Sequence, residues 1–130
     1  MDKTRSSSNK AKRDKDSILV EVKKLLEIYH PVFNRFQKIE RIDGCAREFR
    51  NACYDMIRHF CIAYYCNEAR KENVRLMIGD FGVMMASFDL LRDFGIATNK
   101  DLYLIAERLT RIEDSIGRWR SSLKVSLAST

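Results

Sequence analysis

The segment DGCAREFRNACYDMIRHFCIAYYCNEA, residues 43–69, carries apolar side chains at intervals of three and four residues. This spacing places them along one side of an α-helix. The apolar stripe comprises Phe49, Cys53, Met56, Phe60 and Ala63. A helix with such a stripe buries it against other helices, so the segment predicts one helix of a bundle, with Asp43 as its N-terminal cap.

The same segment carries a second stripe in which cations and aromatic rings share a face. Its members are Arg47, Arg50, Tyr54, Arg58 and Tyr65. Guanidinium groups bind phosphate and tyrosine rings stack on bases, so this stripe is a candidate binding face. Two other interpretations stay open, namely a solvated face with snorkelling arginines, and a subunit interface in which the tyrosines are anchors.

The composition of the 130-residue chain favours a single all-α domain. Hydrophobic residues make up 45% and charged residues 32% of the chain, and one Pro with five Gly argues against a turn-rich β fold. The formal net charge is +6, and residues 1–17 contribute +3 of it from six Lys or Arg and three Asp. A positive balance favours polyanionic partners, nucleic acid above all, although a moderate excess discriminates weakly.

The region before residue 43 divides into an arm and a helix. Residues 1–16 hold Ser, Lys, Arg and Asn with almost nothing to bury, which predicts a disordered basic N-terminal arm. Apolar spacing then predicts a helix over residues 17–37, followed by a loop over residues 38–44. Pro31 cannot donate to the helical ladder, so we expect a kink or a short break there.

Two more helices follow the 43–69 segment. Apolar spacing predicts one over residues 71–94, with Gly95 as its C-terminal stop. The other covers residues 99–123, with Thr98 as its cap, and residues 124–130 are expected to fray. Four helices joined by short loops predict an antiparallel up-down-up-down four-helix bundle over residues 17–123.

Some apolar residues exceed what the core of one bundle requires. They are Cys61, Ile62, Tyr64, Val83, Met84 and Leu90. This extra width predicts subunit contacts, with cover by the basic arm or a loop as the alternative. Gly79 and Gly82 lie inside a predicted helix, where glycine costs about 1 kcal/mol relative to alanine, so we expect another helix to pass close to them.

The last predicted helix also carries arginines, and Arg108, Arg111 and Arg118 join the candidate binding residues. Glu107 precedes Arg111 by four residues, and Asp114 precedes Arg118 by four, so internal pairing partly neutralises this face. We therefore rank the 43–69 segment and the basic arm above the last helix as the binding surface.

No residue pattern predicts catalysis, a cofactor or a metal site. The chain lacks a Gly-rich phosphate loop and a nucleophile motif, and its four cysteines lack a Cys-x-x-Cys pair. His59 and Cys66 offer at most two metal ligands on one helix. The cysteines are expected to be reduced thiols in a cytoplasmic protein, and no apolar run reaches the roughly 20 residues that span a membrane. A non-enzyme without metal or cofactor is predicted.

Four short motifs occur in an order that resembles a known family. They are Tyr29-His30-Pro31-Val32, Gly44-Cys45-Ala46-Arg47-Glu48-Phe49, Gly82-Val83-Met84-Met85 leading to Gly95-Ile96, and Ser115-Ile116-Gly117-Arg118-Trp119. In their order and spacing over about residues 18–123, the chain resembles the accessory variability determinant (Avd) of diversity-generating retroelements. It is more broadly similar to the four-helix-bundle family encoded in intervening sequences of bacterial large-subunit ribosomal RNA genes.

The resemblance implies a ring-shaped homopentamer of four-helix bundles with a positively charged surface. It also implies binding to a reverse transcriptase and to template RNA or cDNA, in support of adenine-directed mutagenic retrohoming, without polymerase activity. Arg47 lies in the matched Gly-x-Ala-Arg-Glu segment and inherits a binding role. The chain departs from the family pattern in its basic arm, in a longer connection between the second and third predicted helices, and in Ser87 and Asp89.

The expected function is thus that of a non-catalytic accessory protein that binds a reverse transcriptase and nucleic acid. The expected binding residues are Arg47, Arg50, Tyr54, Arg58, Arg108, Arg111 and Arg118. The alternatives are a ribosomal RNA intervening-sequence protein, or a protein-interaction scaffold whose cations only keep it soluble.

Overall fold

The computed structural model describes the backbone of residues 3–36, 40–95 and 97–128, and the side chains of residues 18–35, 44–95 and 97–121. Over these residues the chain is all-helical, as predicted, and contains no strand. The elements are α1 (Lys3–Phe36), α2 (Glu40–Tyr65), the 3₁₀ helix η1 (Asn67–Ala69), α3 (Arg70–Asp93) and α4 (Asn99–Ala128). Four long helices are consistent with a four-helix bundle.

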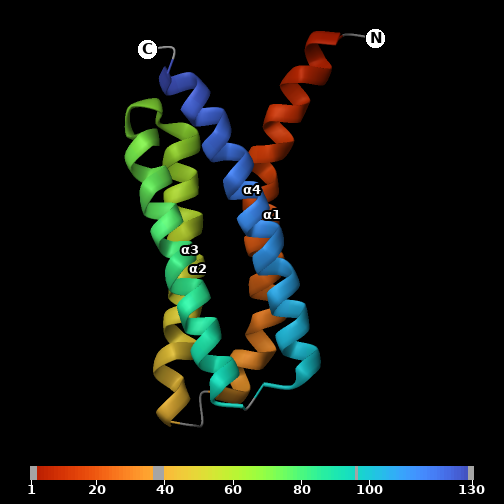
Figure 1. Cartoon of the computed structure of the whole chain (residues 1–130), viewed down its shortest axis with the longest axis vertical. Coiled ribbons are helices and arrows are strands. Elements are labelled where there is room, and N and C mark those ends of the chain that lie inside the picture. Colours follow the sequence, from red (N-terminus) through yellow and green to blue (C-terminus); the bar gives the residue numbers. More distant parts are fainter. Residues whose placement is uncertain (1–2, 37–39, 96, 129–130) are drawn as a thin grey trace.

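The helices associate as two pairs. α2 packs along α3, α1 packs along α4, and α1 also contacts α2 (Figure 1). The backbones of α3 and α4 approach each other over a much shorter length than the helices within either pair. The backbones of the two helix pairs therefore approach each other chiefly along α1 and α2.

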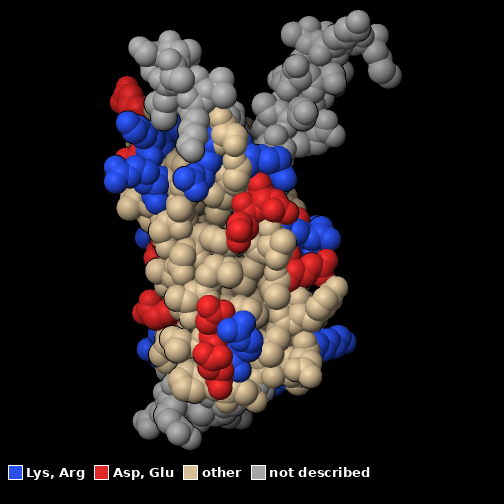
Figure 2. All heavy atoms as spheres, viewed as in Figure 1, with Lys and Arg blue, Asp and Glu red and all other residues tan. Residues whose placement is uncertain are grey.

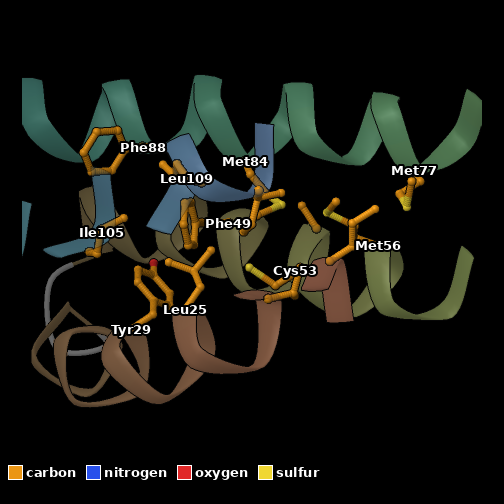
Figure 3. Close-up of a cluster of buried hydrophobic side chains, with 14 of the residues drawn as sticks. Leu25, Tyr29, Phe49, Cys53, Met56, Met77, Met84, Phe88, Ile105 and Leu109 are labelled. Carbon is orange, nitrogen blue, oxygen red and sulfur yellow. The ribbon is translucent and has the colours of Figure 1, made fainter. Parts of the chain in front are cut away.

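The core lies where the apolar stripes of the helices meet. The predicted α2 stripe is buried along its whole length, as are Leu25 and Tyr29 of α1 and Ile105 and Leu109 of α4. Figure 3 shows these side chains converging from different helices. Full burial of one large apolar side chain contributes about 1.5–3 kcal/mol, so these stripes supply most of the favourable free energy.

Tyr29 ties α1 to α2 through the core. Its ring lies 4.4 Å from the ring of Phe49, centroid to centroid, and its hydroxyl donates a 2.8 Å hydrogen bond to the carbonyl oxygen of Ala46. Burial raises the pKa of the Tyr29 hydroxyl well above its ordinary value. The hydroxyl therefore stays a donor, and the hydrogen bond offsets the free energy of burying it.

α1 differs from its predicted form at two places. The helix begins at Lys3, so its backbone includes residues that were predicted to form a disordered arm. A helix already nucleated by packing extends without a second nucleation penalty, and the Lys, Arg and Ala in this region have favourable propensities. The prediction at Pro31 was a kink or a short break, and the helix runs through Pro31 without a break.

The turn between α2 and α3 comes earlier than predicted, because α2 ends at Tyr65 and not at Ala69. Cys66 adopts an extended conformation. The Arg70 side chain then reaches back and donates a 2.9 Å hydrogen bond from Nε to the carbonyl oxygen of Ala63. This contact satisfies an orphan carbonyl at the end of α2, and it could not be read from helical spacing.

The turn between α3 and α4 agrees with its predicted signals. Gly95 has a φ of +71°, the left-handed conformation of a helix C-terminal stop, and α3 ends at Asp93. The Thr98 hydroxyl accepts a 3.1 Å hydrogen bond from the backbone N–H of Asp101, which caps α4 at its predicted start. Burial opposes ionisation of Asp101, but hydrogen bonds from Arg35 and Thr98 outweigh it and lower the Asp101 pKa.

Candidate nucleic-acid interface

The cationic and aromatic stripe of α2 lies on the side of the helix opposite the core, as its spacing predicts. Arg47, Tyr54 and Arg58 are exposed, and Tyr65 is 82% exposed. Because the buried stripe packs against the other helices, the outer stripe necessarily faces away from them. The structure therefore brings these four residues together on one accessible surface, which we call the α2 outer face.

Arg50 lies at the edge of the α2 outer face that borders α1. Its guanidinium carbon is 4.3 Å from the ring centroid of Phe33, a distance typical of a cation–π contact. Arg50 is half-buried, whereas Phe33 is buried. The contact places the guanidinium beside α1.

Arg58 pairs only loosely with its neighbours. Its Nη1 lies 3.4 Å from the Asp55 carboxylate, and its side chain remains 68% exposed. Exposed ion pairs of this kind contribute about 0–1 kcal/mol, so a phosphate can replace the carboxylate at little cost. Arg58 is therefore suited to an incoming anion.

The three candidate arginines of α4 contact residues of the chain, although Arg111 and Arg118 are exposed. Arg108 donates a 3.0 Å hydrogen bond to the Glu21 carboxylate of α1, and both side chains are mostly buried. Arg111 pairs with Glu107 at 3.1 Å, and Arg118 donates a 3.0 Å hydrogen bond to the Ser115 hydroxyl. The structure thus places Arg108, Arg111 and Arg118 on α4, apart from the α2 outer face.

A pocket of about 370 Å³ opens beside the α2 outer face, between α1 and α2. Arg50 and Tyr54 line it from α2, and Glu27 and His30 line it from α1. Sequence reasoning did not identify the two α1 residues. His30 lies in the Tyr29-His30-Pro31-Val32 motif and Glu27 precedes it by three residues, but the partner helix could not be known from these positions.

His59 and Asp80 form a polar pair between α2 and α3 that the helical spacing of the sequence did not reveal. His59 Nδ1 lies 2.5 Å from the Asp80 carboxylate, across the α2–α3 contact, and both side chains are mostly buried. Burial raises the pKa of Asp80, while the hydrogen bond from His59 opposes that rise. The pair bridges two helices and has the character of a structural contact.

The outward side of α3 carries an apolar stripe, in contrast to the cationic and aromatic stripe of α2. Exposed apolar or small residues recur along it, flanked by charged residues such as Arg75 and Asp89, and they are Leu76, Gly79, Gly82, Val83, Ala86 and Leu90. We call this surface the α3 outer face. The predicted surplus of apolar residues is thus confirmed for Val83 and Leu90, and for Ile62 of α2, all exposed. It is wrong for Met84, which is fully buried because it points toward α2.

The helical glycines of α3 do not mark a close helix contact within the chain. A Cβ atom built on Gly79 or Gly82 meets nothing within 4 Å among the described residues. The prediction that another helix of this bundle passes close to them is therefore wrong. Both glycines lie on the exposed side of α3, next to Val83.

A groove of about 650 Å³ lies along the short α3–α4 contact, lined by Ile78 and Phe81 of α3 and by Ile116 and Arg118 of α4. Uncharged residues cover the middle of the molecule in Figure 2, while Lys and Arg gather toward the end that carries the α2–α3 turn.

The described part of the chain shows neither a metal-binding cluster nor a membrane-spanning segment. Among the side chains that the structure describes, no three His, Cys, Asp or Glu groups come close enough to hold a metal ion. Within the described helices, no segment is both long and apolar enough to cross a bilayer. Cys53 is buried, and burial raises the pKa of its thiol, which disfavours the reactive thiolate.

Comparisons of the chain with protein-family models, with curated proteins and with solved structures gave no match.

Proposed function

We propose that this chain is a non-catalytic accessory protein of a diversity-generating retroelement, which binds the reverse transcriptase and its template RNA or cDNA. The observation that supports this proposal is the α2 outer face, where exposed arginines and tyrosines share one surface. Cations bind phosphates and tyrosines stack on bases, so such a surface suits nucleic acid.

The proposal includes an antiparallel up-down-up-down bundle that assembles into a ring-shaped homo-oligomer, a pentamer by the resemblance. The α3 outer face supports assembly, because an exposed apolar stripe on a helix otherwise carries an unfavourable hydration free energy. Glycines without contacts on this side leave room for the backbone of a second copy.

Salt dependence of nucleic-acid binding tests the first part of the proposal. Replacing Arg47, Arg50 and Arg58 with glutamine removes up to three phosphate contacts. The slope of log affinity against log salt concentration should then become shallower by about 2 to 3, because each phosphate contributes about 0.7–0.9. Single-stranded RNA and DNA titrated by fluorescence anisotropy provide the measurement.

A matched control changes the same number of cations on α3. Lys71, Arg75 and Arg92 are exposed there, and Arg75 and Arg92 form surface ion pairs with Glu72 and Asp89. Replacing them with glutamine should leave the slope nearly unchanged. An unchanged affinity and slope in the α2 variant, with both variants folded by circular dichroism, would overturn the assignment of the α2 outer face.

Light scattering tests the assembly. A single chain has a mass of 15.2 kDa, and a ring should have several times that mass. Val83→Glu on the α3 outer face should dissociate the assembly, whereas Val20→Glu on α1 should not, although the two valines are 44% and 43% exposed. A 15.2 kDa species in the unaltered protein contradicts the ring.

A second candidate function is a protein-interaction scaffold, or a ribosomal RNA intervening-sequence protein, without nucleic-acid binding. The apolar α3 outer face favours it, because this surface binds protein and not phosphate. Under this function the α2 glutamine variant keeps all partner binding. The neighbouring genes also discriminate: a reverse transcriptase gene beside repeats that differ at adenines favours the retroelement, and a ribosomal RNA locus favours the alternative.

A further inference from the structure

The pocket between α1 and α2 has the dimensions of a small-ligand site. Its volume of about 370 Å³ falls within the range of roughly 300–1,000 Å³ that is common for ligand pockets. Six of its lining residues matter for recognition, and they are Leu26, Glu27, His30, Phe33, Arg50 and Tyr54. We call this site the α1–α2 pocket.

The wall formed by α2 presents flat groups that are suited to stacking. Tyr54 is 53% exposed and lies one helical turn beyond Arg50, so both side chains face the same side of α2. Arg50 is ordered by its 4.3 Å contact with the Phe33 ring, and Phe33 is only 3% exposed. Guanidinium and phenol groups both stack on planar rings, so this wall is pre-organised for an aromatic ligand.

The wall formed by α1 adds hydrogen-bonding groups at its rim. Glu27 and His30 are exposed and three residues apart, so they lie on one face of α1. An ionised carboxylate only accepts hydrogen bonds, so Glu27 favours a ligand that carries an N–H donor. Glu27 also repels a bare anion inside the pocket, while Arg50 repels a cation. The charges therefore favour a neutral planar ring.

The surroundings of the pocket favour a ring that is joined to phosphates. Arg47 precedes Arg50 by one helical turn, and Arg58 follows Tyr54 by one turn, so exposed cations lie on both sides of the pocket along α2. If the ring in the pocket belongs to a polyanionic chain, the phosphates on its two sides lie near Arg47 and Arg58. A nucleobase in a chain has a phosphate on either side to pair with these cations, whereas a single protein aromatic side chain carries no anion.

We propose that the α1–α2 pocket binds one unstacked, amine-bearing nucleobase of a single-stranded nucleic acid. The base stacks on Tyr54 and Arg50, its exocyclic amine donates to Glu27, and the adjoining phosphates contact Arg47 and Arg58. This inference rests on the proposed nucleic-acid binding function and adds base recognition to it. The same chemistry is available in RNA and in DNA.

The primary test compares oligocytidine, in RNA and DNA forms, with an abasic sugar-phosphate oligomer of equal length and with a blunt duplex. The unaltered protein should bind oligocytidine more tightly than either control at the same salt concentration. Tyr54→Leu should weaken oligocytidine binding by about 5- to 150-fold, the range for loss of one stacked base. Its salt slope should be unchanged, because no charge is removed.

Two further variants sharpen the test. Tyr103→Leu changes a tyrosine of α4 that is 68% exposed and lies outside the pocket, and it should leave affinity unchanged. Glu27→Gln should reduce the preference for oligocytidine over oligouridine, because uracil has no exocyclic amine. Comparison of the RNA and DNA forms in each variant shows whether the sugar contributes.

The outcomes separate this inference from the function on which it rests. Equal binding of the abasic oligomer and oligocytidine, with a steep salt slope retained, overturns the pocket inference and leaves nucleic-acid binding standing. Absence of salt-dependent binding to every oligomer overturns both. Loss of reverse transcriptase binding in Tyr54→Leu, with unchanged nucleic-acid affinity, assigns the pocket to a protein side chain and also overturns the inference.

Discussion

The outer faces of α2 and α3 differ sharply, although the two helices pack against each other along their lengths. The α2 outer face presents arginines and tyrosines, whereas the α3 outer face presents Leu76, Val83 and Leu90 between glycines and an alanine. The buried faces alone hold the two helices together. The packing of α2 against α3 therefore does not require the difference between their outer faces.

The largest effect should separate the buried from the outer face of α2. Phe49 is fully buried against Tyr29, so Phe49→Ala should lower the free energy of unfolding by about 3–5 kcal/mol. Tyr54→Ala on the outer face should change it by no more than about 0.5 kcal/mol. Urea unfolding followed by circular dichroism measures both. Equal losses would show that the outer face is also part of the core.

The His59–Asp80 bridge at the α2–α3 boundary should give the next largest effect. His59→Ala leaves the mostly buried Asp80 carboxylate without this partner, so unfolding free energy should fall by about 1–3 kcal/mol at pH 7. The pKa of Asp80, already raised by burial, then rises further, because the hydrogen bond from His59 had opposed that rise. Asp55 and Arg58 are the other charges that act on Asp80.

The sign of the pH dependence follows from proton binding. The pKa of Asp80 is higher in the native state than in the unfolded state. Between these two pKa values the native state keeps a proton that the unfolded state has lost, so the free energy of unfolding falls as pH rises through this range. The loss caused by His59→Ala should therefore be smaller at pH 4 than at pH 7. Adding Asp80→Asn should abolish this difference, and its persistence would assign it to another group.

A comparison of two arginines should give a similar or smaller effect. Arg108→Gln breaks the mostly buried contact with Glu21 between α4 and α1, and it should cost about 1–3 kcal/mol. Arg58→Gln removes a 68% exposed side chain and should cost less than about 0.5 kcal/mol. Thermal unfolding of the two variants measures the difference. If neither substitution lowers the thermal stability, the arginine of α4 is as available to ligands as the arginine of α2.

The smallest effect tests why glycine occurs on the α3 outer face. Gly79→Ala and Gly82→Ala should each stabilise the single chain by about 0.5–1 kcal/mol, since the added Cβ meets nothing within 4 Å. The same changes should weaken self-association if a second copy packs there. Gly117→Ala on α4 is the matched control for intrinsic stability. If the alanine variants are more stable but self-associate as strongly as the unaltered protein, the α3 outer face is not part of the subunit interface.

The regular parts of the molecule follow from side-chain spacing. The α2 core stripe, the Gly95 stop and the Thr98 cap depend on residues close together in sequence, and they occur where the sequence predicts them. Spacing also places the arginines and tyrosines of α2 on one exposed side, because a helix fixes the angle between successive residues.

The remaining features depend on which helices are neighbours. Arg108 contacts Glu21, which is 87 residues away in the sequence, and His59 contacts Asp80, which is 21 residues away in the sequence. Met84 is buried because α2 lies along its side of α3, although α3 has apolar residues nearly all round. The α1–α2 pocket likewise combines residues from two helices. No pattern within one helix reveals such pairings.

The hydrogen bond from the Tyr29 hydroxyl to the Ala46 carbonyl fixes the axial register of α1 against α2. Each residue of a helix rises 1.5 Å, so a slip of one helix past the other by even one residue breaks a contact that is 2.8 Å long. Leu26 and Phe33 flank this tyrosine on α1, and Arg50 follows Ala46 by one turn. A single phenolic oxygen therefore sets the axial register of the two walls of the adjoining pocket, in which Arg50 of α2 lies beside Phe33 of α1.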